Sequence, residues 1–374
     1  MSFRYGSGIN KPGFDALAAQ TTTYTYELWS WGYNNAGQLG IGSIAAKSSP
    51  NQVGALTTWL DVAGGYHTLA VKTDGTLWSW GNGGYGQLGI GNTSSYSSPK
   101  QVGALTAWLK VAGGFYHSIA TKTDGTLWSW GYNNSGQLGL GDITSRSSPV
   151  QIGALTTWLN IACGNYHTLA VKTDGTLWSW GRNNATGQLG LGDITNRSSP
   201  VQVGALTTWL KVAGGAYFTL ATKTNGTLWS WGQNIYGQLG LGNTTNYSSP
   251  IQVGALTTWS ATAGGAYYTV ATTTGGTLYA WGRNGAGQLG LGNTTNYSSP
   301  KQVGALTAWL KVAGGKYHTI TTKTDGTLWA WGGNAYGQLG LGNVTYYSSP
   351  KQIGTLTTWQ AISVGNNTNV ALKY

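Results

Sequence analysis

The sequence has 374 residues and a formal net charge of +11, yet only 8% of its residues are charged and 12% are aromatic. So many aromatic side chains exclude a disordered chain, because their burial offsets the entropy lost on ordering. The single cysteine, Cys163, excludes an intrachain disulfide and is expected to be a small buried residue.

The first 23 residues differ from the rest of the chain. Residues 1–23 contain three glycines and one proline and predict an irregular N-terminal arm, either a floppy leader or a segment that orders on a partner. They lack the hydrophobic segment of a signal peptide, and no apolar run is long enough for membrane insertion. We therefore expect a soluble protein without a classical secretion signal, either cytoplasmic or virion-associated.

A repeated motif begins after this arm. Leu-Trp-Ser-Trp-Gly, or a close variant, is followed each time by Gly-Gln-Leu-Gly, a polar loop, Ser-Ser-Pro and a further tryptophan. The motif recurs every 49–51 residues, a period typical of repeat architectures. Its second tryptophan falls at Trp31, Trp80, Trp130, Trp180, Trp231, Trp281 and Trp331.

The third copy shows the predicted elements best. Residues 118–123 alternate like a strand, residues 124–125 (Asp-Gly) predict a type I′ turn, and residues 126–131 form the returning strand. Residues 147–149 (Ser-Ser-Pro) open an edge strand, since proline cannot donate to an interior ladder, and residues 156–164 lead to the next inner strand. Four short strands in about 50 residues are typical of a propeller blade.

Alternation in the returning strand predicts how blades pack. Trp128 and Trp130 should point to one face of the sheet, and Leu127 and Ser129 to the other. Buried aromatic faces packed on neighbouring sheets would then supply most of the stability.

The two ends of the repeat region complete each other. Residues 359–374 match the first half of a unit, whereas residues 25–32 begin with the Trp-Gly strand and lack its inner partner. Joined, they make one blade and close the ring. The sequence therefore predicts an all-β fold for residues 24–374: a seven-bladed β-propeller of four-stranded blades in which the N- and C-terminal strands share one blade.

The combination of these motifs with Val-Ala-Gly-Gly-x-Tyr-His-Thr resembles the regulator-of-chromosome-condensation repeat family across residues 24–374. The resemblance implies a seven-bladed propeller with a split closing blade, but not one activity, because members include a nucleotide exchange factor for the GTPase Ran, a plant UV-B photoreceptor and a secreted β-lactamase inhibitor. Blades of 49–51 residues leave no room for the exchange factor's wedge. The positions matching the photoreceptor's tryptophans hold Phe115, Asn165, Ala216, Ala266 and Lys316.

Candidate chemistry is sparse. His67, His117, His167 and His318 occupy one repeat position, where other copies have Phe218, Tyr268 and Thr368. Four imidazoles around an axis could hold a metal, but replacement by Phe and Tyr favours hydrogen-bonded histidines on inner strands. Asp142 and Asp193 are interpreted as turn-capping residues. Neither a Ser-His-Asp set nor a phosphate-binding loop breaks the repeat, so we expect no enzyme activity, no metal and no cofactor.

The positions at which the copies differ indicate where a partner could bind. They follow the Trp-Gly step, precede Gly-Gln-Leu-Gly, or precede the Tyr-His step, and should cluster on one face near the axis; the alternative is unconstrained surface. The candidate partner-binding residues are Tyr33, Tyr85, Phe115, Tyr132, Arg182, Tyr236, Arg283, Lys316 and Tyr336.

We therefore expect a non-enzymatic scaffold that engages a macromolecule through this loop face and the arm, as in a structural or receptor-binding component of a virus or phage. The alternatives are a glycan-binding lectin, with multivalent loops, and, less favoured, a GTPase exchange factor. Nucleic acid is a less favoured partner than protein or glycan. The lysines before the turns do not form a run and predict a solvated basic rim: Lys72, Lys122, Lys172, Lys223 and Lys323.

Overall fold

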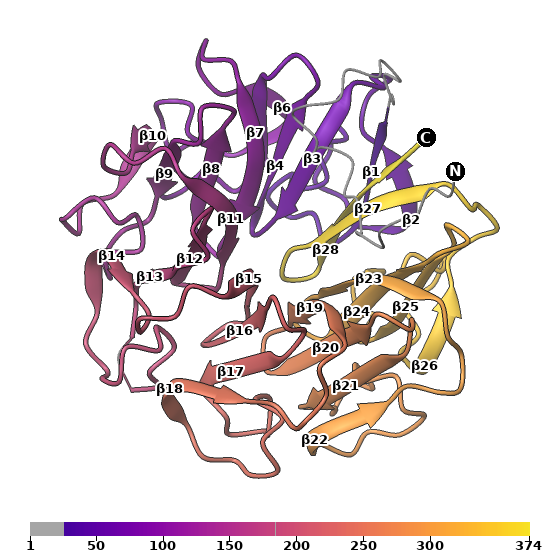
Figure 1. Ribbon diagram of the computed structural model, residues 1–374. Coiled ribbons are helices and arrows are strands. Elements are labelled where there is room, and N and C mark those ends of the chain that lie inside the picture. Colours follow the sequence, from indigo (N-terminus) through magenta and orange to yellow (C-terminus); the bar gives the residue numbers. More distant parts are fainter. Residues whose placement is uncertain (1–25, 184) are drawn as a thin grey trace, which may run out of the picture.

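The chain forms a closed ring of seven antiparallel sheets, each of four strands (Figure 1). The computed structural model describes residues 26–183 and 185–374, so the predicted arm, residues 1–23, lies outside the described residues. The predicted seven-bladed β-propeller is confirmed.

Six blades are contiguous in sequence and follow one another around the ring. Their strands are, in blade 1, β3 (Trp59–Gly64), β4 (His67–Lys72), β5 (Leu77–Gly81) and β6 (Tyr96–Gln101); in blade 2, β7 (Trp108–Gly113), β8 (His117–Lys122), β9 (Leu127–Gly131) and β10 (Arg146–Gln151); in blade 3, β11 (Trp158–Cys163), β12 (His167–Lys172), β13 (Leu177–Gly181) and β14 (Arg197–Gln202); in blade 4, β15 (Trp209–Gly214), β16 (Phe218–Lys223), β17 (Leu228–Gly232) and β18 (Tyr247–Gln252); in blade 5, β19 (Trp259–Gly264), β20 (Tyr268–Thr273), β21 (Leu278–Gly282) and β22 (Tyr297–Gln302); and in blade 6, β23 (Trp309–Gly314), β24 (His318–Lys323), β25 (Leu328–Gly332) and β26 (Tyr347–Gln352).

The seventh blade is built from both ends of the described chain. Its strands are β27 (Trp359–Val364), β28 (Thr368–Lys373), β1 (Glu27–Gly32) and β2 (Lys47–Gln52), paired in that order. β1 and β28 pair along their whole length, from Glu27 opposite Lys373 to Gly32 opposite Thr368. A salt bridge of 3.1 Å between the Lys373 Nζ and Glu27 Oε2 atoms closes the end of this ladder. The shared closing blade predicted from the sequence is confirmed.

The central channel is lined by the strands that begin at the tryptophan after Ser-Ser-Pro, such as β3 and β7. These strands are therefore the innermost of their blades. The histidine strands β4, β8, β12 and β24 are second from the axis. Placing the histidines on inner strands was therefore wrong by one strand. The reason is that residues 156–164 pair with the histidine strand as a full strand of the same blade, rather than merely leading to it.

The Asp-Gly hairpin turns differ from the type I′ prediction. In blade 2 the Gly125 N–H donates to the Lys122 carbonyl at 3.0 Å, and only Gly125, with φ of 79°, is left-handed, whereas Asp124 is not. The loop is thus a type I turn followed by a glycine bulge. The Asp124 carboxylate instead accepts hydrogen bonds from the backbone N–H and the hydroxyl of Thr126 at 2.9 and 2.7 Å. Those two bonds hold Thr126, the first residue after the turn, against Asp124.

Neighbouring blades meet through large apolar side chains, as the strand alternation predicts. Trp130 is fully buried against Leu69 and Val71 of the preceding blade, while Leu127 on the opposite face packs with Trp180 of the following blade. Gly139 of the Gly-Gln-Leu-Gly loop is required here. A Cβ atom on it would lie 2.7 Å from the Trp180 Nε1 atom, and its φ is 72°.

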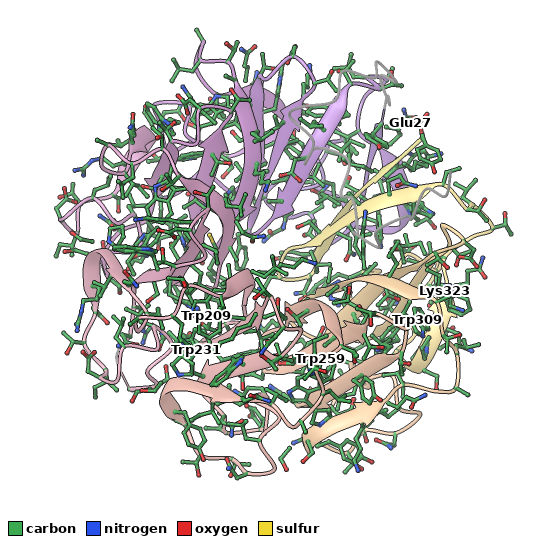
Figure 2. The ribbon with its side chains drawn as sticks, viewed as in Figure 1. Glu27, Trp209, Trp231, Trp259, Trp309 and Lys323 are labelled. Carbon is green, nitrogen blue, oxygen red and sulfur yellow. The ribbon has the colours of Figure 1, made fainter. Side chains whose placement is uncertain are left out.

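The five lysines predicted to form a solvated rim are instead tucked into tryptophan pairs. Lys72 lies over Trp78 at 4.0 Å and Trp59 at 5.2 Å from the ring centroids, and the same arrangement recurs in blades 2, 3, 4 and 6. Only 8% of Lys72 and 8% of Lys223 is exposed, and burial lowers the pKa of Lys223. Figure 2 labels one such contact, between Lys323 and Trp309 of blade 6. The solvated-rim prediction is wrong because cation–π packing desolvates these side chains.

Cys163 also differs from its prediction, because it is half-buried in the wall of the channel, where Gly64 and Gly113 stand in other blades. Within the described ranges, 26–183 and 185–374, no helix is long and apolar enough to cross a membrane.

Candidate functional site

The sequence positions predicted to bind a partner meet on one face of the ring. In each blade the residue after the Trp-Gly strand bonds back to the loop that joins the first two strands. The backbone N–H of Tyr132 donates to the Tyr116 carbonyl at 2.9 Å, and that of Arg182 donates to the Tyr166 carbonyl at 2.9 Å. We call this end of the ring the tyrosine face, defined by those first loops (such as residues 114–116) and by the loops after Trp-Gly. The opposite end, which carries the hairpin turns, is the hairpin face.

Aromatic rings occupy one side of the tyrosine face. Tyr85 lies 4.8 Å from both Tyr116 and Tyr132, measured between ring centroids, and Phe115 lies 4.2 Å from Tyr66. These five side chains, from blades 1 and 2, form what we call the aromatic cluster. A separate pair, Tyr33 and Tyr336 at 4.6 Å, bridges the closing blade and blade 6.

Cationic residues occupy the other side of the same face. The Arg283 guanidinium lies 5.2 Å from the ring centroid of Tyr236, and it also contacts the rings of Tyr267 and Tyr317. Lys316 lies over Tyr317 at 5.2 Å. Arg182 of blade 3 lies at 5.5 Å over the rings of both Tyr166 and Tyr217. The structure thus brings all nine candidate residues to one face. Seven of them contact tyrosines of the first loops, and the other two, Tyr33 and Tyr336, contact each other.

The tyrosines of the Tyr-His step were missed by sequence reasoning. The position holds tyrosine in six of the seven copies, so it did not stand out among the variable positions, yet these are the rings on which the variable residues pack. Burial raises the pKa of Tyr66, Tyr116 and Tyr267, and raises that of Tyr166 to about 12. The seventh copy has Asn367 at this position, which was the one sign in the sequence that the fold does not require tyrosine there. The six are Tyr66, Tyr116, Tyr166, Tyr217, Tyr267 and Tyr317.

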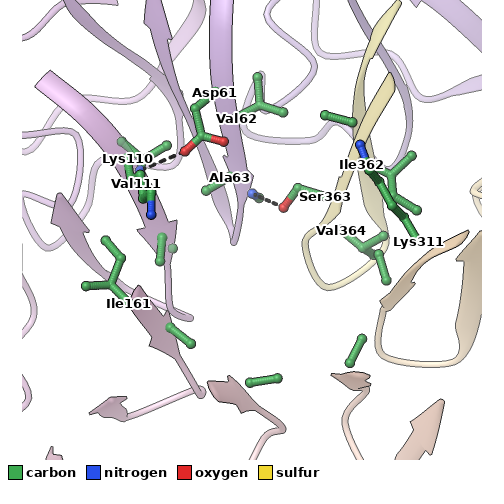
Figure 3. Close-up of a pocket in the computed structure, with 18 of the residues that line it drawn as sticks. Asp61, Val62, Ala63, Lys110, Val111, Ile161, Lys311, Ile362, Ser363 and Val364 are labelled. Carbon is green, nitrogen blue, oxygen red and sulfur yellow. Dashed lines mark hydrogen bonds between the residues drawn. The ribbon is translucent and has the colours of Figure 1, made fainter. Parts of the chain in front are cut away.

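The central channel contains a cavity of about 400 Å³ that is lined by the innermost strands (Figure 3). Asp61 accepts a hydrogen bond from the Val111 backbone N–H at 3.0 Å, and the Lys110 ammonium donates to the Leu159 carbonyl at 2.8 Å. The Lys311 ammonium bonds the Gln360 carbonyl in the same way. Each of these side chains bonds the backbone of the next blade, so these bonds stabilise the contacts between adjacent blades.

The four histidines do not converge on a metal. Each ring contacts a polar side chain of the following blade through Nε2: His67 with Ser118 at 2.6 Å, His117 with Thr168 at 3.0 Å, and His318 with the Asn369 side-chain oxygen at 2.8 Å. Burial lowers the pKa of His67, His117 and His167 to about 3 and that of His318 to about 4. Among the described residues there is no cluster of His, Cys, Asp or Glu that could hold a metal ion. The hydrogen-bonded structural role is supported.

Asp142 and Asp193 cap loops, as expected, and also hold an arginine. The Thr144 N–H donates to the Asp142 carboxylate at 2.8 Å, and the Arg146 guanidinium pairs with the same carboxylate at 2.6 Å. Asp193 and Arg197 repeat this arrangement in blade 3.

Comparison with known proteins identifies the repeat. The family described as the regulator of chromosome condensation (RCC1) repeat matches residues 27–71, 74–121, 124–171, 174–222, 225–272, 275–321 and 325–372, and a second description of the same repeat matches parts of five blades. No curated protein matches this chain by sequence.

Solved structures share the fold at low identity. Human WBSCR16 is 23% identical with a TM-score of 0.85, over 93% of this chain and 98% of that one. Prp20p from Saccharomyces cerevisiae, described with its binding properties to Gsp1p and histones, is 21% identical with a TM-score of 0.82, over 94% and 92%. Yeast RCC1 (Prp20) bound by Kap60 is 20% identical with a TM-score of 0.83, over 100% and 94%.

Proposed function

The chain belongs to the regulator of chromosome condensation (RCC1) repeat family, and we propose that it is a non-enzymatic scaffold that binds another protein through its tyrosine face. The structures that share its fold include a protein described as binding Gsp1p and histones and a complex with Kap60, which makes a protein partner reasonable. Their identities of 20–21% do not transfer those particular partners to this chain.

The observation that carries this proposal is the composition of the tyrosine face. Tyrosine and arginine are the residue types that contribute most to protein–protein binding, because they offer large contact areas together with hydrogen-bond donors. Here they gather around one mouth of the channel and hold each other in place by ring contacts. Tyr85 and Tyr336 remain 44% and 43% exposed, so a partner that binds there would bury additional apolar surface of these two rings.

The other predicted functions remain proposals of lower rank. The exchange-factor alternative gains support from the relative described as binding Gsp1p, although the uniform blades of this chain carry no wedge among the described residues. A nucleotide-release assay tests it directly, with no acceleration expected. The virion assignment and the glycan-binding lectin receive no support from the comparisons.

Site-specific photo-crosslinking tests the proposed function. A benzoylphenylalanine at position 85 or 336 should crosslink to a partner protein in extract from the source cells. Matched probes at Leu256 and Leu306, which are 42% and 49% exposed on the hairpin face, should not. Adducts only at positions 256 and 306, or none at any position, would contradict binding through the tyrosine face.

A further inference from the structure

Blade 5 differs from the other six blades at the last residue of its second strand. In those six blades this residue is a lysine, and its ammonium lies 3.7–5.2 Å from the ring centroids of a tryptophan pair or, in the closing blade, of Trp29. Blade 5 has Thr273 instead. The register confirms the equivalence, because Thr273 pairs with Trp259 as Lys223 pairs with Trp209 in blade 4.

The aromatic pair itself is kept in blade 5. The ring centroids of Trp259 and Tyr279 lie 5.5 Å apart with an interplanar angle of 72°, against 6.1 Å and 79° for Trp209 and Trp229 of blade 4. In the described part of the chain, the lysines of the two neighbouring blades lie over their own tryptophans, and no lysine or arginine lies over either ring of blade 5. Blade 5 thus has the two rings of this arrangement without their cation.

The side of blade 5 on which a lysine would lie opens toward the hairpin face. Thr273 and Tyr279 are half-buried, whereas Thr274 and Gly275 of the adjoining turn are exposed. A Cβ atom on Gly275 would meet only Thr273 Oγ1, at 3.9 Å. Trp259 is 5% exposed, so its ring forms the buried wall of this place. Threonine lacks the part of a lysine side chain beyond Cγ, and a short alkyl chain that ends in an ammonium replaces that part.

The ring pair suits an ammonium even without a carboxylate beside it. The negative faces of aromatic rings attract cations, and they do so most strongly where protein excludes water. In blade 4, Lys223 lies 3.7 Å from the ring centroid of Trp229 although its turn has Asn225 where other blades have aspartate. Tyrosine attracts a cation less strongly than tryptophan, so Tyr279 weakens the attraction in blade 5 without removing it.

We propose that Trp259 and Tyr279 of blade 5 bind a small aliphatic amine. The ligand class is a primary alkylammonium, as in free alkyl diamines. The ammonium lies over the two rings, and the alkyl chain passes Thr273 along the path that the lysines take in the other blades. The site is on the hairpin face and binds a small molecule, so it is independent of the protein-binding role of the tyrosine face and adds no protein crosslink at Leu256.

Saturation-transfer NMR with propylamine tests the proposal. At neutral pH this probe is a short alkylammonium similar to the end of a lysine side chain. Propanol is the matched probe, because it has nearly the same size and no charge. We expect saturation transfer from the protein to the methylene protons of propylamine, and titration should show that propanol binds about fivefold more weakly. Equal binding of propanol, or no transfer to propylamine, would overturn the proposal.

A matched pair of variants locates the site. Thr273→Lys introduces the residue of the other six blades, so the variant should fold and its own ammonium should abolish the binding of propylamine. The control, Thr294→Lys, adds the same charge to an exposed loop at the other end of blade 5 and should leave the binding unchanged. Equal losses in the two variants would mean that net charge alone repels the probe, and would refute the site.

Two further variants test the roles of the rings and of the lysine. Tyr279→Trp restores the pair found in blade 4 and should tighten the binding of propylamine about twofold. Lys223→Thr gives blade 4 the residue of blade 5 and should create a second site, so that two molecules bind per chain. Circular dichroism checks that both variants are folded. Weaker binding by a folded Tyr279→Trp protein, or a single site in a folded Lys223→Thr protein, would contradict the proposal.

Discussion

At the scale of single residues, the histidines show how a polar group can belong to the core. Each is buried and neutral, and each bonds the next blade around the ring. Because burial holds their pKa values near 3 to 4, the unfolded chain takes up protons first as the pH falls below 6.5. The free energy of unfolding is therefore highest above pH 6.5 and falls as the pH drops toward 4.

Acid titration of stability checks this. Each histidine should contribute a slope of about 1.4 kcal/mol per pH unit between pH 6 and pH 4.5. His117→Phe should remove about one such contribution from the slope, and blade 4 shows that the site accepts the ring, since Phe218 stands there and Thr269 of the next blade keeps its bond to the Gln238 carbonyl. Urea unfolding of both proteins at several pH values measures the difference. An unchanged slope would mean that His117 is protonated in the fold.

At the scale of elements, the hairpin turns are stabilised by a side chain that accepts hydrogen bonds from the residue two positions later. Five of the six contiguous blades have Asp or Asn at the position that accepts two bonds from Thr, and blade 5 has Gly275 instead. Gly275 has no left-handed φ, and a Cβ atom there would meet only Thr273 Oγ1, at 3.9 Å. The turn of blade 5 can therefore accept a larger residue at position 275 without a clash or backbone strain.

Gly275→Asp should therefore stabilise the protein. The gain should be about 1 kcal/mol, from lower entropy of the unfolded chain plus hydrogen bonds to Thr277. Gly275→Ala is the control, because it supplies only the backbone part. Urea midpoints at equal m-value give the comparison. If Asp were no better than Ala, the carboxylate bonds would contribute nothing to stability.

At the scale of the whole molecule, the closing blade differs from every other junction. Elsewhere, adjacent blades are joined by side chains and scattered hydrogen bonds, but the first and last described segments are joined by the β1–β28 ladder. That ladder turns an open row of blades into a ring without an unpaired edge at either end.

A circular permutant isolates this effect. The sister turn Thr-Asp-Gly can link Lys373 to Glu27, and new termini can be opened at Leu105, an exposed residue between β6 and β7. All seven blades then remain intact, but the new ends meet only through side chains. We expect the permutant to fold and to unfold at least about tenfold faster, since β-ladder contacts no longer oppose opening. Stopped-flow unfolding monitored by tryptophan fluorescence measures this, and equal rates would show that side-chain packing alone holds the ring shut.

Much of this architecture could be predicted from the sequence because the same strand and turn motifs recur in seven copies. Blade number, the shared blade and the orientation of Trp130 against Leu127 all followed from periodicity and alternation. The lysine–tryptophan pairs did not, because a lysine before a turn looks solvated until the register places Lys72 opposite Trp59. The role of Tyr116 was hidden for a related reason: variation between copies detects positions that are free to change, not the fixed rings on which they rest.

Each family repeat contains the outer two strands of one blade and the inner two of the next. Residues 74–121, for example, begin in the turn before β5 and end in β8, so they give two strands to blade 1 and two to blade 2. The seam between two blades is thus encoded inside a single repeat. A gene duplication or deletion of one unit would add or remove a whole seam with both of its surfaces already matched. A ring made this way can change in size during evolution without first passing through a mismatched interface.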